Sequence, residues 1–235
     1  MQNRYENKNI VVVGAGKSGQ ALCRFFAARS AHVVLSDQRA KEQIEGIATL
    51  DRLPIKYDLG GHVVELFRAA DLVVLSPGVP ETISPVQAAK DVGVSVIGEI
   101  EVAIRELEAP MIGITGTNGK STVTALAGEI FKAVGQKAYV GGNIGEPLTD
   151  AVDAGQWDWV VIELSSFQLE TMTSFQTRYS MLLNISEDHL DRYPDMTAYV
   201  AAKKNIFMNQ ASDDYMILNA DDSEVLKAAA DSQAT

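Results

Sequence analysis

Short apolar runs alternate along the chain with longer segments whose apolar residues recur at helical spacing. Runs of Val, Ile and Leu that end in glycine-rich turns, with amphipathic stretches between them, are typical of a parallel α/β fold. Strands are therefore expected at residues 10–13, 32–36, 72–75, 94–97, 111–115, 137–140, 157–162, 180–185 and 215–218. Helices are expected up to residue 29, from residue 84 onwards, and over residues 99–108, 120–134 and 197–208.

The order of these elements predicts two domains. In this interpretation, residues 1–98 form a Rossmann-like parallel-sheet domain and residues 99–235 form a P-loop-type α/β domain. A chain of 235 residues that is 46% hydrophobic is long enough to bury the two cores that this division requires.

The first expected strand runs into a glycine loop that opens a helix. Its spacing is Gly14-x-Gly16-x-x-Gly19, and the acidic residue Asp37 follows the second strand. This pattern is typical of sites that hold a pyrophosphate at a helix N-terminus. It fits NAD and a UDP-sugar equally, with Asp37 meeting a ribose hydroxyl or a uracil N–H. A tight turn without a ligand is the plain structural alternative.

A rigid turn, Ser76-Pro77-Gly78, follows the strand expected at residues 72–75. Ligands of open parallel sheets bind outside the carboxyl ends of the strands, so this turn is a candidate wall of a base pocket. Pro-Gly is also ordinary turn chemistry, which is the competing interpretation.

A second glycine loop carries the strongest nucleotide signal. Residues 110–122 read PMIGITGTNGKST, an apolar strand followed by a loop that ends in Lys120 and Ser121. In such loops the backbone N–H groups face phosphate oxygens, the lysine neutralises the outer phosphates and the hydroxyl completes a Mg²⁺ shell. The spacing departs from the usual P-loop, because Ile114 occupies the place of the first glycine and Gly113 stands one position earlier. The alternative is a strand–turn–helix whose lysine is merely solvated.

Polar residues follow three further expected strands. Asn143 lies in the segment GGNIGEP, Glu163 ends an apolar strand, and His189 stands in the polar run NISEDHLDRYP. A carboxylate at a strand end beside a P-loop is the expected place of a Mg²⁺ ligand. A solvated acid and a structural histidine are the alternatives. On the next helix, Lys203 and Lys204 form by default a solvated cationic face.

Composition narrows the classes of partner. The formal charge of −11 argues against nonspecific binding of nucleic acid or of an anionic membrane. The single cysteine, Cys23, excludes an internal disulfide and is expected to be buried. No apolar run reaches the ~18 residues of a membrane span, so a cytoplasmic location is expected. His32 and His62 are interpreted as surface or strand-edge residues.

Seven segments of the chain carry a family resemblance: GAGKSG, SPGVP, GITGTNGKSTVT, GGNIGEP, ELSSFQLE, NISEDHLDRYPDM and AAKKNIF. In this order they resemble the Mur ligase family over nearly the whole chain. The TGTNGK[ST] loop is shared with the wider family, which includes folylpolyglutamate synthases. ELSSFQLE and EDHLDRYP resemble the corresponding segments of the family members that add D-glutamate.

The resemblance implies that the first domain binds the UDP part of UDP-N-acetylmuramoyl-L-alanine and that the second binds ATP with two Mg²⁺ ions. The residues that would hold the UDP substrate are Gly14, Lys17, Ser18, Asp37, Gln38, Ser76, Gly78, Asn143, Ser165 and Gln168. Gln38 departs from the threonine of the family pattern. The residues that would hold ATP are Gly116, Thr117, Asn118, Gly119, Lys120, Ser121 and Thr122.

The resemblance also implies a metal set and a reaction. Ser121, Glu163, His189 and, once carbamylated by CO₂, Lys203 would ligate Mg²⁺, and the catalytic residues would be Lys120, Asn143, His189 and Lys203. A lysine carbamate is an anion that can ligate a cation, whereas an ammonium would repel it. The implied reaction is ATP-dependent amide-bond formation. The L-alanine carboxylate attacks the γ-phosphorus, and the D-glutamate amine then displaces phosphate from the acyl phosphate.

Length limits what this chain is expected to do alone. Family members carry a third domain that brings the D-glutamate site, and by this resemblance the sequence stops before the middle domain is complete. We therefore expect a monomer that binds the UDP substrate and turns over poorly or not at all. Three alternatives stay open: a related ligase that uses a different amino acid, an NAD-dependent dehydrogenase with an accessory P-loop, and a nonhydrolysing nucleotide-binding regulator.

Overall fold

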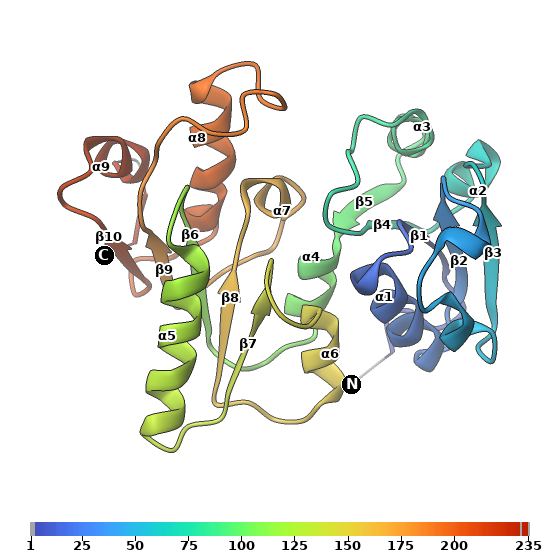
Figure 1. Ribbon diagram of the computed structural model, residues 1–235, viewed down its shortest axis with the longest axis horizontal. Coiled ribbons are helices and arrows are strands. Elements are labelled where there is room, and N and C mark those ends of the chain that lie inside the picture. The colour runs from blue at the N-terminus through green and yellow to red at the C-terminus, as the bar shows by residue number, and fades with distance from the viewer. Residues whose placement is uncertain (1–2, 231, 235) are drawn as a thin grey trace. The chain divides into compact units, whose positions relative to one another are not determined.

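The computed structural model describes residues 3–230 and 232–234, and the chain divides into two compact units (Figure 1). One unit ends at Ala103 and also contains Pro147–Asp153, and the other takes Ile104–Glu146 and continues from Ala154. Each unit is built on a five-stranded parallel sheet, so the predicted α/β class with two parallel-sheet domains is confirmed. The functional boundary between residues 98 and 99 stays a prediction.

The sheet of the first unit has the strand order β3-β2-β1-β4-β5. Its strands are β1 (Asn9–Val13), β2 (His32–Asp37), β3 (Ile55–Leu59), β4 (Leu72–Leu75) and β5 (Ser95–Gly98). Its helices are α1 (Lys17–Ala28), α2 (Val64–Arg68), α3 (Ser84–Asp91), α4 (Glu99–Ile104) and α6 (Leu148–Asp153), with 3₁₀ turns at Lys41–Gln43 and Ile47–Leu50. The order reverses between β1 and β4, which places a topological switch point at the carboxyl ends of these strands.

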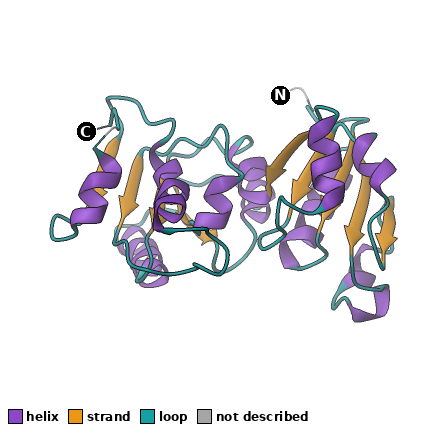
Figure 2. Ribbon diagram, turned by 90° about the horizontal axis from the view of Figure 1, so that it is seen from above, coloured by secondary structure: helices purple, strands orange, loops and turns teal. Residues whose placement is uncertain are grey.

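The core of the first unit has a layer on each face of the sheet. Val11 and Val13 of β1 pack into one apolar cluster, while Ile10 and Val12 pack into the other. Helices cover both faces in consequence (Figure 2). Cys23 of α1 is fully buried, as predicted, and burial raises the pKa of its thiol to about 12. This cysteine is therefore packing material with little thiolate to react.

Helix α6 belongs to the first unit, although it follows β6, α5 and β7 of the second unit in sequence. Glu99 at the start of α4 accepts hydrogen bonds from the Thr149 backbone N–H at 2.7 Å and the Thr149 hydroxyl at 3.0 Å. Burial raises the pKa of Glu99 to about 7. The Arg29 guanidinium also pairs with Asp153 at 2.8 Å. These contacts hold α6 against the first unit, so the chain crosses between the units on both sides of this helix.

The sheet of the second unit has the order β10-β9-β6-β8-β7, with β6 at its centre. Its strands are β6 (Met111–Thr115), β7 (Ala138–Gly142), β8 (Trp159–Glu163), β9 (Tyr179–Leu182) and β10 (Tyr215–Leu218). Its helices are α5 (Lys120–Ala133), α7 (Ser166–Glu170), α8 (Met196–Lys204) and α9 (Ser223–Ala229), and α8 continues into a 3₁₀ turn at Asn205–Phe207. Gly113 of β6 lies where a Cβ would come within 3.1 Å of Phe175 and Thr177, so packing explains the glycine that the loop spacing left unexplained.

Several predicted boundaries were wrong by a few residues. The helix expected over residues 99–108 ends at Ile104, and the helix expected over residues 197–208 loses α geometry after Lys204. The strand expected over residues 180–185 ends at Leu182, because Asn184 leaves the sheet and hydrogen-bonds the Asn118 backbone N–H at 2.8 Å. Strand β3 was not predicted.

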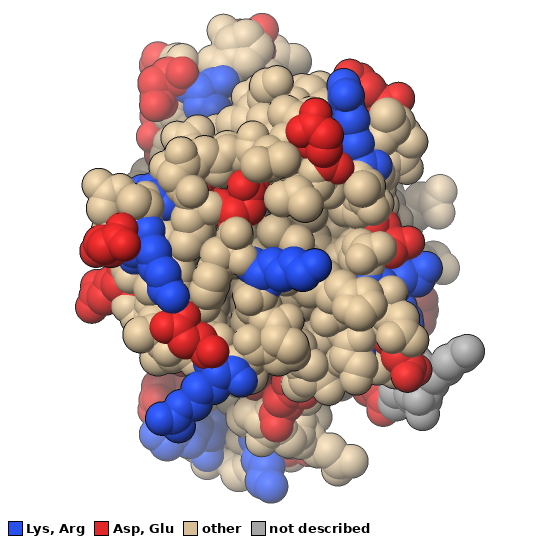
Figure 3. All heavy atoms as spheres, turned by 90° about the vertical axis from the view of Figure 1, so that its right-hand side faces the viewer, with Lys and Arg blue, Asp and Glu red and all other residues tan. Residues whose placement is uncertain are grey.

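The surface carries both acidic and basic side chains. Acidic and basic side chains are interspersed on the face shown in Figure 3. Among residues 3–230 and 232–234, no helix has the length and apolar character needed to cross a membrane.

Candidate nucleotide-binding sites

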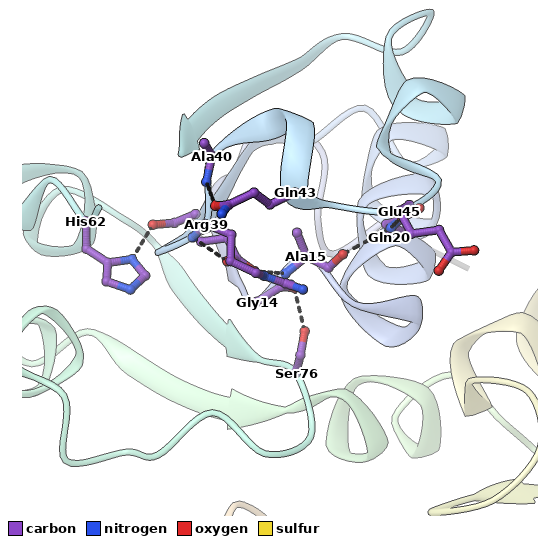
Figure 4. A network of polar contacts seen from close by, with 11 residues as sticks. Gly14, Ala15, Gln20, Arg39, Ala40, Gln43, Glu45, His62 and Ser76 are labelled. Carbon is purple, nitrogen blue, oxygen red and sulfur yellow. Dashed lines mark hydrogen bonds and ion pairs between the residues drawn. The ribbon is translucent and has the colours of Figure 1, made fainter. Parts of the chain in front are cut away.

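The first glycine loop is held in place by hydrogen bonds to its own backbone (Figure 4). The Ser76 hydroxyl donates to the Gly14 carbonyl at 2.8 Å, and the Gln20 side-chain amide donates to the Ala15 carbonyl at 3.0 Å. A Cβ on Gly19 would lie 1.8 Å from the Gly14 carbonyl oxygen, so only glycine lets the start of α1 touch the loop. The loop is therefore preformed, with Lys17 and Ser18 in the first turn of α1. Anions are favoured at such a helix N-terminus.

Asp37 at the end of β2 is committed to the protein. Its Oδ2 accepts from the Ala15 backbone N–H at 2.7 Å and from Arg39 Nη2 at 2.8 Å, and its Oδ1 accepts from the Arg39 backbone N–H and from Nε. The Arg39 guanidinium lowers the pKa of the Asp37 carboxyl to about 2. Because four donors already occupy the carboxylate, a ligand contact by Asp37 would have to displace or share one of them. That contact stays a prediction.

A cavity of about 300 Å³ opens beside the loop. Its lining consists of Val13, Gly14, Asp37, Gln38, Arg39, His62, Gly78, Val79, Pro80 and Ile83. Four residues predicted for the UDP substrate thus line one cavity: Gly14, Asp37, Gln38 and Gly78. Arg39 and His62 also line it, and sequence reasoning did not include them. His62 is partly buried and follows β3, a strand at the sheet edge that the sequence analysis missed, which agrees with its interpretation as a surface or strand-edge residue.

The second glycine loop is also folded onto itself. Gly119 has φ +82° and caps α5, a backbone conformation that favours glycine. The Lys120 ammonium donates to the Gly116 and Thr117 carbonyl oxygens, both at 3.0 Å. The Thr117 backbone N–H donates to the Asn184 carbonyl at 3.0 Å. Ser121 and Thr122 stand in the first turn of α5 with exposed side chains.

Lys203 of α8 reaches the same loop from the interior. Its side chain is 1% exposed, and its Nζ donates to the Gly116 carbonyl at 2.8 Å. Burial lowers the pKa of Lys203 to about 7, with a further lowering by Lys120 and an opposing effect of Asp188. The default interpretation of a solvated cationic face is therefore wrong for this lysine. Two lysine side chains converge on one carbonyl oxygen.

Glu163 ends β8 beside the loop, in register with Ile114 of β6. The carboxylate is 1% exposed, and its Oε1 accepts from the Asn143 side-chain amide at 2.8 Å. Its Oε2 is buried without a hydrogen-bond partner in the part of the chain that the structure describes. A buried carboxylate oxygen is costly unless something satisfies it. A divalent cation that prefers oxygen ligands, such as Mg²⁺, would satisfy this oxygen.

His189 occupies a strained turn near aromatic rings. Its φ is +55°, and its ring lies 4.9 Å from the Phe167 ring and 6.0 Å from the Tyr199 ring. In residues 3–230 and 232–234, no three His, Cys, Asp or Glu side chains come together to hold a metal ion. The predicted set contains only two residues of these types, Glu163 and His189, with the Ser121 hydroxyl and Lys203 as the other donors. The two predicted Mg²⁺ sites stay a prediction.

Ser165 and Gln168 form the N-terminal cap of α7. The Gln168 backbone N–H donates to Ser165 Oγ at 3.2 Å, and Gln168 Oε1 accepts from the Ser165 backbone N–H at 3.0 Å. The Gln168 Nε2 is buried and has no partner among the described residues. The cap accounts for the serine and for the amide oxygen, and the amide nitrogen keeps its hydrogen-bonding capacity.

The two sheets and their loops define an α/β protein with two candidate nucleotide sites, and a buried carboxylate lies beside the second glycine loop. Residues 8–98 match the Mur ligase MurD-like N-terminal domain, and residues 114–235 match the Mur ligase middle domain. The chain belongs to the Mur ligase family, whose members are ATP-dependent ligases.

Several curated relatives are UDP-N-acetylmuramoylalanine–D-glutamate ligases. The protein of Syntrophotalea carbinolica is 51% identical over 97% of this chain, and that of Geotalea uraniireducens is 52% identical over 92%. These matches cover 50% and 48% of the relatives, so the chain spans about half of their length.

Solved structures support the fold. A UDP-N-acetylmuramate:L-alanyl-gamma-D-glutamyl-meso-diaminopimelate ligase from Neisseria meningitides matches with a TM-score of 0.63 and 18% identity, over 97% of this chain and 76% of that one. A UDP-N-acetylmuramate-alanine ligase from Thermotoga maritima matches with a TM-score of 0.56 and 22% identity, over 94% of this chain and 51% of that one. At these identities the likeness shows the fold alone.

Proposed function

We propose that this chain contains the UDP-substrate unit and the ATP unit of a ligase that adds D-glutamate to UDP-N-acetylmuramoyl-L-alanine. The observation that carries the proposal is that the Lys120 loop follows β6 while Glu163 ends the neighbouring strand β8, with an Oε2 that has no hydrogen-bond partner among the described residues. An ammonium group that can bind phosphates, beside a carboxylate that can ligate Mg²⁺, suits phosphoryl transfer. The relatives at about half identity supply the choice of substrates.

In this proposal the first unit holds the UDP moiety. The preformed Gly14–Gly19 turn and the N-terminus of α1 receive the diphosphate, and the cavity beside Gln38 and Gly78 receives the base. Lys17, Ser18 and Ser76 stand at the phosphate end. Asn143, Ser165 and Gln168 would contact the muramoyl arm.

The second unit would hold ATP. Lys120 exchanges its two loop carbonyls for the outer phosphates, and residues 116–122 surround them with backbone N–H groups. Mg²⁺, when bound, would neutralise phosphate charge and polarise the γ-phosphoryl oxygens. Glu163, Ser121 and His189 are its proposed ligands, at two sites. The L-alanine carboxylate would attack the γ-phosphorus, ADP would leave and an acyl phosphate would form. The D-glutamate amine would then attack the acyl carbon, displace phosphate and lose a proton as the amide bond forms.

Lys203 has a chemical role in the proposal. An amine with a pKa of about 7 is substantially neutral near neutral pH, and a neutral amine is the form that adds CO₂. CO₂ would add to the neutral amine nitrogen with loss of one proton, and the resulting carbamate would place an anion at the loop that contains Gly116. Intact-mass measurement in bicarbonate tests this step, and an unmodified Lys203 in the ligand-bound protein would remove it.

The test of the function is phosphate release by the complete gene product with a panel of amino acids. We expect ATP-dependent release that needs both UDP-N-acetylmuramoyl-L-alanine and D-glutamate. Release with another amino acid in place of D-glutamate would assign a different ligase of the same family. Binding of NADH and not of UDP to the first unit would overturn the proposal. Because ATP and a UDP-linked precursor are the proposed substrates, we propose that the reaction takes place in the cytoplasm. We also propose that the protein is a monomer.

A further inference from the structure

A chain of hydrogen bonds fixes His62 at the wall of the first-unit cavity. Ser36 Oγ lies 2.7 Å from Asp58 Oδ2 and 2.7 Å from His62 Nδ1. Ser36 is fully buried, and Asp58 Oδ2 also accepts from the Val63 backbone N–H at 3.1 Å. The His62 ring lies edge-on to the ring of Phe67 at 5.8 Å. Figure 4 shows His62 facing its partner through one ring nitrogen.

The protons of this chain can be placed by elimination. An ionised carboxylate only accepts hydrogen bonds, so Ser36 must donate its single O–H to Asp58. Ser36 Oγ then has only lone pairs left for His62, so His62 Nδ1 must carry the hydrogen and donate it. In a neutral imidazole with Nδ1 protonated, Nε2 is a lone-pair acceptor. Among the described residues, Nε2 of His62 has no hydrogen-bond partner.

The cavity offers this acceptor to a ligand in apolar surroundings. Val79, Pro80 and Ile83 line the cavity together with His62 and can cover the faces of a planar base. Asp37, the other acceptor at the same wall, is already occupied by Ala15 and Arg39. Nε2 of His62 is therefore an acceptor of this wall that remains available to a donor on the base, and the Ser36 contact holds its ring in place.

We propose that His62 determines base specificity in this cavity by accepting the imide N3–H of uracil at Nε2. This inference rests on the proposed binding of a UDP substrate by the first unit. Uracil presents N3–H as a donor, whereas cytosine presents a lone pair at the same position. The fixed lone pair of His62 stabilises the first base and repels the second. Ser36 and Asp58 act as positioning residues, because they set the tautomer and touch no ligand.

The binding test compares UDP with CDP by calorimetric titration of the 235-residue chain. Wild type is expected to bind UDP at least about tenfold more tightly than CDP. His62→Phe keeps a flat ring against Phe67, removes both ring nitrogens, and is expected to lose about tenfold in UDP affinity and most of the preference. His32→Phe is the matched control, since His32 begins β2 away from the cavity lining, and it should bind as wild type does.

A second measurement needs no substitution in the cavity. The chain has three histidines, so ring ¹⁵N spectra of labelled wild type are simple to assign with the His32→Phe variant. We expect a protonated Nδ1 and a bare Nε2 for His62 in the free protein, with the Nε2 resonance moving towards the hydrogen-bonded range when UDP is added. CDP should leave it nearly unmoved.

The outcomes separate this inference from the function it rests on. If wild type binds neither UDP nor CDP, the proposed UDP site fails. If wild type prefers UDP, and His62→Phe binds UDP with unchanged affinity and preference, the role of His62 is overturned while the UDP site stands. The role of His62 is also overturned if Nε2 carries a proton in the free protein, or if its resonance does not shift when UDP is added. This measurement decides the question even if His62→Phe does not fold.

Discussion

The two glycine loops of this chain each follow a strand and open a helix, but they differ in the charged side chains around them. In the Gly14–Gly19 loop, the nearby cation and anion neutralise each other, because Arg39 is paired with Asp37 and Asp37 is bound to the loop. In the loop that ends in Lys120, two lysine side chains converge on the Gly116 carbonyl, one of them buried.

This difference matches two tasks. A loop beside which Asp37 and Arg39 are already paired suits a diphosphate that is held by backbone N–H groups and does not react. The second loop has two lysines and, beside it, a carboxylate oxygen without a partner in the part of the chain that the structure describes. This arrangement suits a triphosphate bound with a divalent cation, because phosphoryl transfer shifts negative charge between the phosphate oxygens. We therefore expect substitutions at one loop to leave binding of the other loop's ligand unaffected.

The largest effect is expected for Lys120→Ala. Loss of a charged hydrogen-bond donor to the outer phosphates should weaken Mg-ATP binding by about 100-fold and leave UDP binding unchanged. Calorimetric titration with each nucleotide measures both effects. Lys132→Ala on the exposed face of the same helix is the control. Wild-type affinity for Mg-ATP in Lys120→Ala would show that the loop does not bind phosphates as proposed.

Next comes Glu163→Gln, which removes the charge of the proposed metal ligand with little change of shape. We expect the Mg²⁺-dependent part of ATP affinity to fall by about 10- to 100-fold. The measurement is ATP binding with and without Mg²⁺. Glu170→Gln, which alters a surface pair with Arg192, serves as the matched variant. An unchanged response to Mg²⁺ would contradict the role of Glu163.

Lys203→Met tests the buried amine through the pH dependence of the free energy of unfolding. Lys203 has a pKa of about 7 in the folded protein against 10.5 in the unfolded chain. Between these values the unfolded chain binds one proton more, so this group makes the free energy of unfolding rise with pH across that window. In CO₂-free buffer, the variant should be more stable than wild type near pH 7, by roughly 1–2 kcal/mol, and the gap should close towards pH 10. A gap that does not change with pH would refute the assignment.

The smallest effect is expected for Asp37→Asn beside the first glycine loop. The pKa of Asp37 is lowered to about 2 from 3.8, so its stabilisation is fully present above about pH 5 and is lost as the pH falls towards 2. Arg39 is half exposed, so we expect a loss of only about 1 kcal/mol at neutral pH. Denaturant unfolding of both proteins at pH 7 and pH 2.5 measures it. An equal difference at the two pH values would argue against the ion pair.

The parallel sheets and both loops could be predicted because buried parallel strands are apolar runs that end in recognisable turns. Strand β3 (Ile55–Leu59) lies at the sheet edge, is only partly buried, and carries Lys56 and Asp58, so its pattern was too weak to detect. Missing that strand also hid His62, which is placed by β3 and by its contact with Ser36.

Other features depend on contacts between distant residues. Lys203 and Lys204 are neighbours in sequence, and only the packing of α8 makes the first of them buried. The paired state of Asp37 depends on the rotamer of Arg39, and the placement of α6 in the first unit depends on Glu99 and Thr149. A single sequence carries no pattern that specifies such contacts.

The most direct test of the two-loop account is a titration of this chain with UDP in the absence and in the presence of a saturating, nonhydrolysable ATP analogue with Mg²⁺. We expect one UDP site per chain, and we expect it to stay available when the analogue is bound. Competition between UDP and the analogue for a single site would contradict it.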